Sequence, residues 1–116
     1  MYKIALFLSF TQLSTACNIN SDEDPEKNDN PEVPGTIYGS STLSLDEAYS
    51  SFKTSLESND QIGIVAEVDH SQNAASINKE LGPTKIIFFG NPSLGTPLMQ
   101  ENQLAGLDLP QKVLFY

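Results

Sequence analysis

The sequence lacks arginine altogether. Its six basic side chains are all lysines, and they stand against 15 acidic residues, which gives a formal net charge of −9. An acidic chain is repelled by the phosphate backbone, so we expect no nucleic-acid partner. Arginine also provides the paired hydrogen bonds with which proteins hold phosphate and carboxylate groups, so its absence counts against nucleotides and anionic substrates.

Histidine and cysteine each occur only once, as His70 and Cys17. A single cysteine excludes an internal disulfide, and any catalytic arrangement built on a histidine would have to use His70. No recognisable metal-ligand spacing surrounds His70, so the sequence identifies neither a metal nor a cofactor. No motif of a known reaction is present, and we assign no catalytic residue.

Long apolar runs are missing as well. The first apolar stretch, from Ile4 to Phe10, is too short to cross a bilayer, which takes about 20 residues. It follows Lys3 and precedes the small residues 14–16. This order is typical of a secretory signal peptide, which we place at residues 1–16, and it predicts an extracytoplasmic location.

The segment Leu13 to Cys17, LSTAC, resembles a bacterial lipobox, in which the cysteine becomes the acylated first residue of the mature protein. Lipoboxes favour leucine where this chain has Ser14, and the small residues Ser14 and Ala16 also suit the ordinary signal peptidase. We expect lipidation at Cys17, because no disulfide can use this thiol and a polar tract follows it. The alternative is plain secretion into the periplasm with a free thiol.

Residues 17–34 form an acidic tract with three prolines and almost no apolar side chain. Such a segment cannot bury enough surface to offset its loss of conformational entropy on ordering. We therefore expect a disordered tether that leads into a single α+β domain over residues 35–116. That domain has about 80 residues, enough for one thin core.

The first half of this domain shows two strand patterns and two helix patterns. Residues 36–38 and 62–68 predict strands, and Ser44 with Glu47 has the spacing of a capping box that starts a helix. A second helix is expected from Ser71 to Leu81, because Gly82-Pro83 is a typical helix stop. The residues expected on the core face of the second strand are Ile62, Ile64, Ala66 and Val68.

The second half is organised around residues 84–99, where a buried strand at 85–89 is followed by a turn at 90–92. A third helix is predicted to begin at Pro97 behind a Thr96 cap. The apolar residues 113–116 predict a last strand. We expect this strand to lie in the centre of the sheet or to self-associate, because an apolar edge leaves backbone groups unpaired.

Three strings, GIVAEVDHSQNA, FFGNPSLGTPLM and LDLPQKVLFY, resemble the bacterial family catalogued as domain of unknown function 302. The resemblance covers residues 36–116. It implies an α+β fold like that of the TATA-binding-protein class, with a small curved antiparallel sheet, helices packed on one side, and a further strand after Tyr116. The family brings no established activity with it.

A polar pocket is expected if the strand ends that precede the second and third helices lie at the same edge of the sheet. Two helix starts with free amide groups would then converge there with polar side chains. The alternative is that Asn91 and Thr96 only satisfy turn and cap amides while His70 lies exposed in a loop. The ligand-binding candidates are Asp69, His70, Asn73, Asn91 and Thr96.

Together these patterns predict an exported, lipid-anchored envelope protein whose domain binds a small ligand or another envelope protein. The alternative is an enzyme, or a redox, metal or haem accessory protein, that uses His70. The expected partners are the membrane, through a lipid on Cys17, and an unidentified small ligand or envelope protein.

Overall fold

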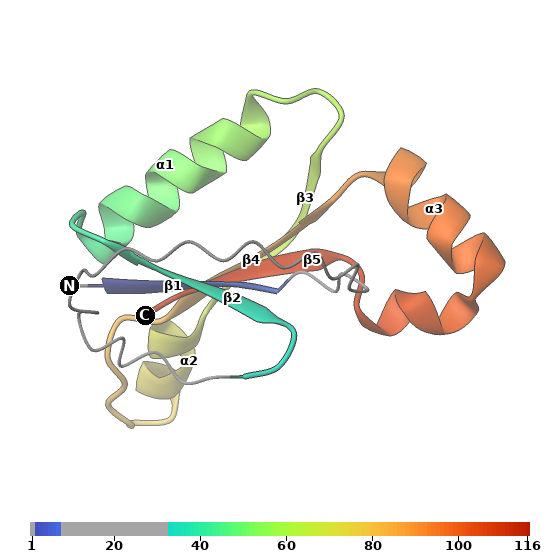
Figure 1. The fold of residues 1–116 in the computed structure, drawn as a ribbon. Helices are drawn as coiled ribbons and strands as arrows, with labels where there is room; N and C mark the ends of the chain where they lie inside the picture. Colours follow the sequence, from blue (N-terminus) through green and yellow to red (C-terminus); the bar gives the residue numbers. More distant parts are fainter. Residues whose placement is uncertain (1, 8–32) are drawn as a thin grey trace, which may run out of the picture.

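The computed structural model describes residues 2–7 and 33–116, which form a five-stranded sheet, three α-helices and one short 3₁₀ helix (Figure 1). No helix within these ranges is long and apolar enough to span a membrane. The elements in chain order are β1 (Tyr2–Phe7), β2 (Thr36–Ser41), α1 (Leu45–Glu57), β3 (Gly63–Asp69), α2 (His70–Ser76), β4 (Lys85–Gly90), α3 (Pro92–Glu101), η1 (Gln103–Leu107) and β5 (Gln111–Phe115).

The strand order is β2-β1-β5-β4-β3, and every neighbouring pair is antiparallel. This arrangement confirms the predicted α+β class. β5 lies between β1 and β4, so the central placement expected for residues 113–116 is also confirmed. The helical connections α2 and α3 lie at opposite ends of the sheet, because α2 leads into the start of β4 and α3 follows its end (Figure 1).

The first strand lies inside the segment assigned to a signal peptide. Tyr2–Phe7 pairs with β2 on one side and with β5 on the other. Lys3 and Tyr116 exchange two backbone hydrogen bonds, with N···O distances of 2.6 and 2.9 Å. The signal peptide at residues 1–16 is therefore not confirmed, since the structure uses part of it as a strand. Cys17 and most of the predicted tether lie outside the described residues.

The core is formed where α1 packs against β4 and β5. Phe52 of α1 meets Phe89 of β4 edge to face, with the ring centroids 5.5 Å apart, and such a pair adds about 0.5–1.5 kcal/mol beyond the area it buries. Neither α2 nor α3 contributes a buried residue, so α1 is the helix that closes this face. The buried core residues are Leu45, Ala48, Leu56, Ile87, Phe89, Val113 and Phe115.

Helix α1 begins at the predicted capping box. The Ser44 hydroxyl accepts a hydrogen bond from the backbone N–H of Glu47 at 3.3 Å, and the Glu47 carboxylate accepts one from the backbone N–H of Ser44 at 2.9 Å. Hydrogen bonds from the Ser44 side chain and backbone lower the pKa of Glu47. The cap thus fixes the helix start directly before the buried Leu45.

Helix α2 differs from the predicted helix at both ends. Asp69, and not Ser71, is the N-cap, because its carboxylate accepts a hydrogen bond from a backbone N–H of the first turn at 3.0 Å. The helix ends at Ser76, because Asn78 adopts a φ of 56° that a right-handed helix does not allow. Residues 77–81 of the predicted helix therefore lie outside it, and the two apolar side chains among them are largely exposed, Ile77 (68%) and Leu81 (51%).

Helix α3 begins at Pro92, not at Pro97. Asn91 is the N-cap in place of Thr96, and its side-chain oxygen accepts a hydrogen bond from the backbone N–H of Ser93 at 2.9 Å. Proline fits the first helical position because its missing N–H has no intrahelical partner there. The pair Asn91-Pro92 is therefore a helix start, and Pro97 lies inside the helix.

The predicted core face of β3 is wrong beyond Ile64. Ile64 stands opposite Phe89 and Ala66 stands opposite Phe88, so Val65 has no partner in the register. An extra residue of this kind is a β-bulge, and it exchanges the two faces of the strand that follows it. Glu67 therefore faces α1 where the simple alternation places Ala66 and Val68.

Ser44→Ala tests the capping box. Loss of the hydroxyl leaves the N–H of Glu47 without its acceptor, and we expect the free energy of unfolding to fall by about 1 kcal/mol. Urea unfolding followed by circular dichroism measures this change. Ser50→Ala, at an exposed position on α1, is the matched control and should change stability little. Equal losses in the two variants would contradict the prediction.

Candidate functional site

The predicted polar pocket needed the ends of two strands to meet at one edge of the sheet. The register excludes this, because Asp69 stands opposite Lys85 at one end of the β3–β4 pair and Gly90 lies at the other end. Asn91 follows Gly90, so it is separated from His70 by the length of β4, on the order of 17 Å at about 3.3 Å per residue. The structure therefore divides the predicted site residues into two groups.

Asp69, His70 and Asn73 lie at the end of the sheet that carries α2. The carboxylate of Asp69 accepts hydrogen bonds from the Ser71 hydroxyl and from a backbone N–H of α2, and Lys85 lies 4.0 Å away. These contacts, chiefly the Ser71 hydrogen bond, lower the pKa of Asp69. His70 and Asn73 are exposed. Asp69 is thus engaged in capping, while the other two side chains are accessible to solvent.

Asn91 and Thr96 lie at the opposite end, on α3. Asn91 caps this helix, as expected under the alternative in which it satisfies a backbone amide. Thr96 is exposed within the helix and does not act as a cap. Ligand binding by any of the five predicted residues remains a prediction.

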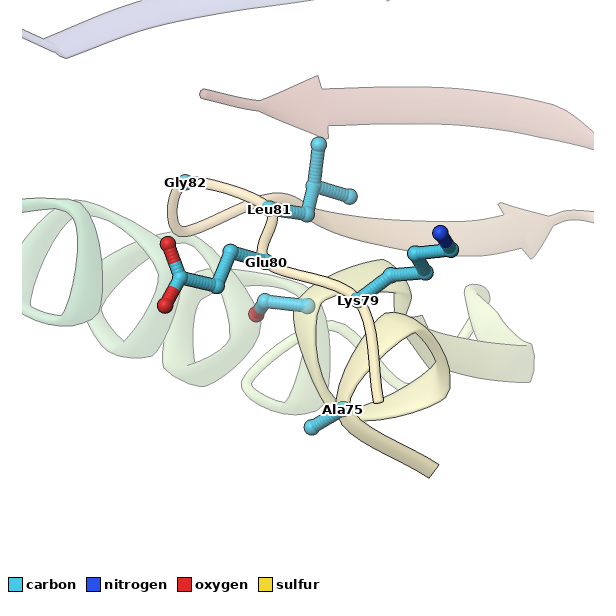
Figure 2. Close-up of a pocket in the computed structure, with 6 residues that line it drawn as sticks. Ala75, Lys79, Glu80, Leu81 and Gly82 are labelled. Atoms are coloured by element: carbon cyan, nitrogen blue, oxygen red, sulfur yellow. The ribbon is translucent and has the colours of Figure 1, made fainter. Parts of the chain in front are cut away.

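A pocket of about 520 Å³ lies between α2 and the segment that returns to β4 (Figure 2). This volume lies in the range of small-molecule sites, roughly 300–1,000 Å³, but the pocket is shallow and largely open to solvent. Figure 2 shows the side chains of Lys79 and Glu80 pointing in opposite directions. This pocket could not be predicted from the sequence, because most of its lining was expected to be helix. Its lining residues are Ser71, Ala75, Lys79, Glu80, Leu81 and Gly82.

A polar cluster that the sequence analysis missed connects α1 with β3. Glu67 accepts a hydrogen bond from the Tyr49 hydroxyl at 2.7 Å and another from the Lys53 ammonium at 2.6 Å. The hydrogen bonds from Lys53 and Tyr49 lower the pKa of Glu67. Burial and the neighbouring Glu67 raise the pKa of Tyr49, so this hydroxyl keeps its proton. The cluster therefore holds the helix on the strand and supplies no free base.

Four exposed leucines lie on α3 and η1, which project beyond one end of the sheet (Figure 1). Two are spaced four residues apart on α3 and two are spaced three apart on η1, so each pair shares one face of its helix. Exposed apolar side chains that share a helix face are candidates for an interaction site, and the two pairs lie on consecutive helical segments. We call these residues the leucine surface: Leu94 (69% exposed), Leu98 (58%), Leu104 (69%) and Leu107 (78%).

These features define a small α+β domain in which one helix covers an antiparallel sheet and further helical segments lie at its two ends. Residues 37–116 match the family model described as Domain of unknown function DUF302, and the chain belongs to this family. A crystal structure of the uncharacterized conserved protein DUF302 from Bacillus stearothermophilus is similar, with a TM-score of 0.52 and 18% identity. The match covers 62% of this chain and 65% of that chain, and it shows the shared fold.

Two curated proteins are similar to part of the chain. They are named Fluoride-specific ion channel FluC 1, from Brucella suis biovar 1 (strain 1330) and from Brucella abortus biovar 1 (strain 9-941). Each is 43% identical over 53 residues, which is 46% of this chain. The match spans 21% of the first protein and 20% of the second, so this chain corresponds to about a fifth of their length.

Glu67→Gln tests the cluster between α1 and β3. We expect the free energy of unfolding at pH 7 to fall by about 0.2–1 kcal/mol, the range for exposed ion pairs. The folded-state pKa of Glu67 lies below 4.5. Its contribution is therefore fully present above pH 4.5 and is lost as the pH falls through the folded-state pKa.

Urea unfolding at pH 7 and at pH 3 measures this difference, which should shrink in acid. Glu57→Gln is the control, because Glu57 touches Lys53 only at 4.0 Å and leaves both hydrogen bonds to Glu67 in place. A loss of stability that is equally large at both pH values would speak against an ionised Glu67 as its cause.

Proposed function

We propose that this chain is an exported, lipid-anchored member of the DUF302 family whose domain binds an envelope protein. The apolar leader, the small residues before Cys17 and the acidic tract after it support export and lipidation. The single observation that carries the binding role is the leucine surface on α3 and η1.

The chemistry of this surface fits an apolar partner. No lysine lies between Lys85 and Lys112, and the acids within α3, η1 and their connection to β5 are Glu101 and Asp108. Burying a leucine side chain fully yields about 1.5–3 kcal/mol, so covering even part of the surface supports association. Because α3 and η1 contribute no buried residue, a partner can dock there without disturbing the core.

The partial match to the Brucella proteins gives further support. A segment similar to nearly half of this chain occurs there within much longer proteins that are named as ion channels. This occurrence fits a module that works beside other domains at a membrane, which is also where a lipid on Cys17 would hold the present chain.

A small ligand in the pocket beside α2 is the second candidate. The favouring observation is its volume of about 520 Å³ and the presence of Ser71, the neighbour of His70, in its lining. An enzymatic, metal or haem-linked role of His70 has less support. In the described part of the chain, no three His, Cys, Asp or Glu side chains are grouped closely enough to hold a metal ion.

Cys17→Ser tests the anchor. It should abolish labelling by a fatty-acid analogue and release the protein from the membrane fraction, because the thiol that carries the lipid is gone. Gln12→Ala keeps the thiol and should remain labelled. A wild-type protein that takes up no label and fractionates as soluble would replace lipidation with plain secretion.

A photoreactive amino acid tests the leucine surface. Placed at Leu98 or Leu104 in cells, it should cross-link to a discrete partner protein, because these side chains would lie in the interface. Placed at the exposed Gln100 of α3, two residues away and on a different helix face, it should give little product. Equal cross-linking from all three positions would show that the leucine surface is not the docking face.

A further inference from the structure

Strand β1 pairs with β5, and it lies outside the segment that supplies the buried core residues named above. All seven buried core residues lie between Leu45 and Phe115. Ile4 of β1 is partly buried and packs against this cluster, and no residue of β2 belongs to it. Helix α1 and strands β4 and β5 supply all seven of these buried residues.

The segment Tyr2–Phe7 cannot be both a strand of the mature domain and part of a cleaved signal peptide. It is a strand in the structure, and it is part of the leader that export would remove. This step depends on the proposed function, because cleavage before Cys17 takes β1 away and uncovers one side of β5. The two strands that flank the emptied place are β2 and β5.

The side of β5 that β1 covers carries backbone groups that can pair with another strand. The backbone N–H and C=O groups of Tyr116 both bond to Lys3. In an antiparallel ladder, every second residue of a strand directs its backbone groups to the same neighbouring strand. The backbone groups of Lys112 and Leu114 therefore face the same place. Val113 and Phe115, which follow these two residues in turn, are each only 1% exposed in the intact sheet. An uncovered apolar edge of this kind is a template for another strand.

We propose that β5 of a second copy takes the place of β1, antiparallel and with a two-fold axis at Leu114. In the structure, Ile4 stands opposite Phe115 and Leu6 stands opposite Val113. In the dimer, Val113 stands opposite the partner's Phe115, and Phe115 stands opposite the partner's Val113. Apolar residues thus replace apolar residues in the same alternation, and the α1 helices of both copies cover the same face of one continuous sheet. In this sheet β4 of the second copy takes the position of β2, which loses the strand it pairs with when β1 is removed.

The strand β2 of the same chain is a poorer occupant. It is antiparallel to β1, which is antiparallel to β5, so β2 runs parallel to β5. Its sequence, TIYGSS, offers small and polar residues over half its length. A second β5 keeps the antiparallel direction and supplies both large apolar residues, so it reproduces the pairing that β1 makes.

Ala5→Pro in the full chain tests the proposal independently of export. Proline lacks the N–H that a strand paired on both sides needs, so this variant empties the place whether or not the leader is cleaved. We expect a dimer by light scattering, at a concentration where the unprocessed Ala5→Val control is a monomer. Adding Leu114→Lys should restore the monomer, because two ammonium groups then meet at the axis. A folded Ala5→Pro chain that stays monomeric overturns the proposal.

Leu114→Cys in the exported protein gives a second measurement. Where mass spectrometry shows residues 1–16 removed, a mild oxidant should link two chains through the introduced thiols, since directly opposed strand residues lie within disulfide range. Ile86→Cys, on β4 opposite Leu114, is one strand further from the axis and should not link. Equal linking by both variants overturns the proposal. A chain that is never cleaved refutes export alone, and the Ala5→Pro result then decides the pairing.

Discussion

The packing of α1 against β4 and β5 is the interaction on which the rest of the structure depends. A domain of this size buries about 60% of the surface of its unfolded chain, so few side chains carry the hydrophobic stabilisation. Here they are concentrated in one layer, where Ile87, Val113 and Phe115 are almost completely buried beneath α1. The end helices α2 and α3 contribute no buried residue to it.

The elements of this layer could be predicted from the sequence because local signals and burial agree there. The Ser44–Glu47 box starts a helix by hydrogen bonds within four residues, and the apolar run of β4 has one straightforward reading as a strand. The bulge at Val65 could not be predicted in the same way. It is set by pairing with β4 and by the Tyr49 and Lys53 hydrogen bonds to Glu67, which are contacts distant in sequence.

The helix starts show a different limit. Asn91-Pro92 and Asp69 are typical both of turns and of helix caps, and the sequence does not decide between these roles. The two strand ends that were expected to converge lie apart for a topological reason. Strands β3 and β4 are neighbours and antiparallel, so the end of one lies beside the start of the other, and the helix that follows each strand lies at a different end. Convergence of two such ends requires parallel strands.

The bulge at Val65 has a consequence for how the sheet can grow. Val65 is unpaired in the register of the outer strand β3, and Glu67 and Asp69 bring charge to the face that α1 covers. Bulges and inward charges are the means by which sheets prevent edge-to-edge pairing. In the proposed form without β1, the side of β5 that β1 had covered is then the place where another chain can pair. The proposed pairing through β5 is isologous, which means that both molecules use the same strand. No unpaired β5 then remains, so the assembly stops at a dimer. A head-to-tail contact would instead continue into a filament.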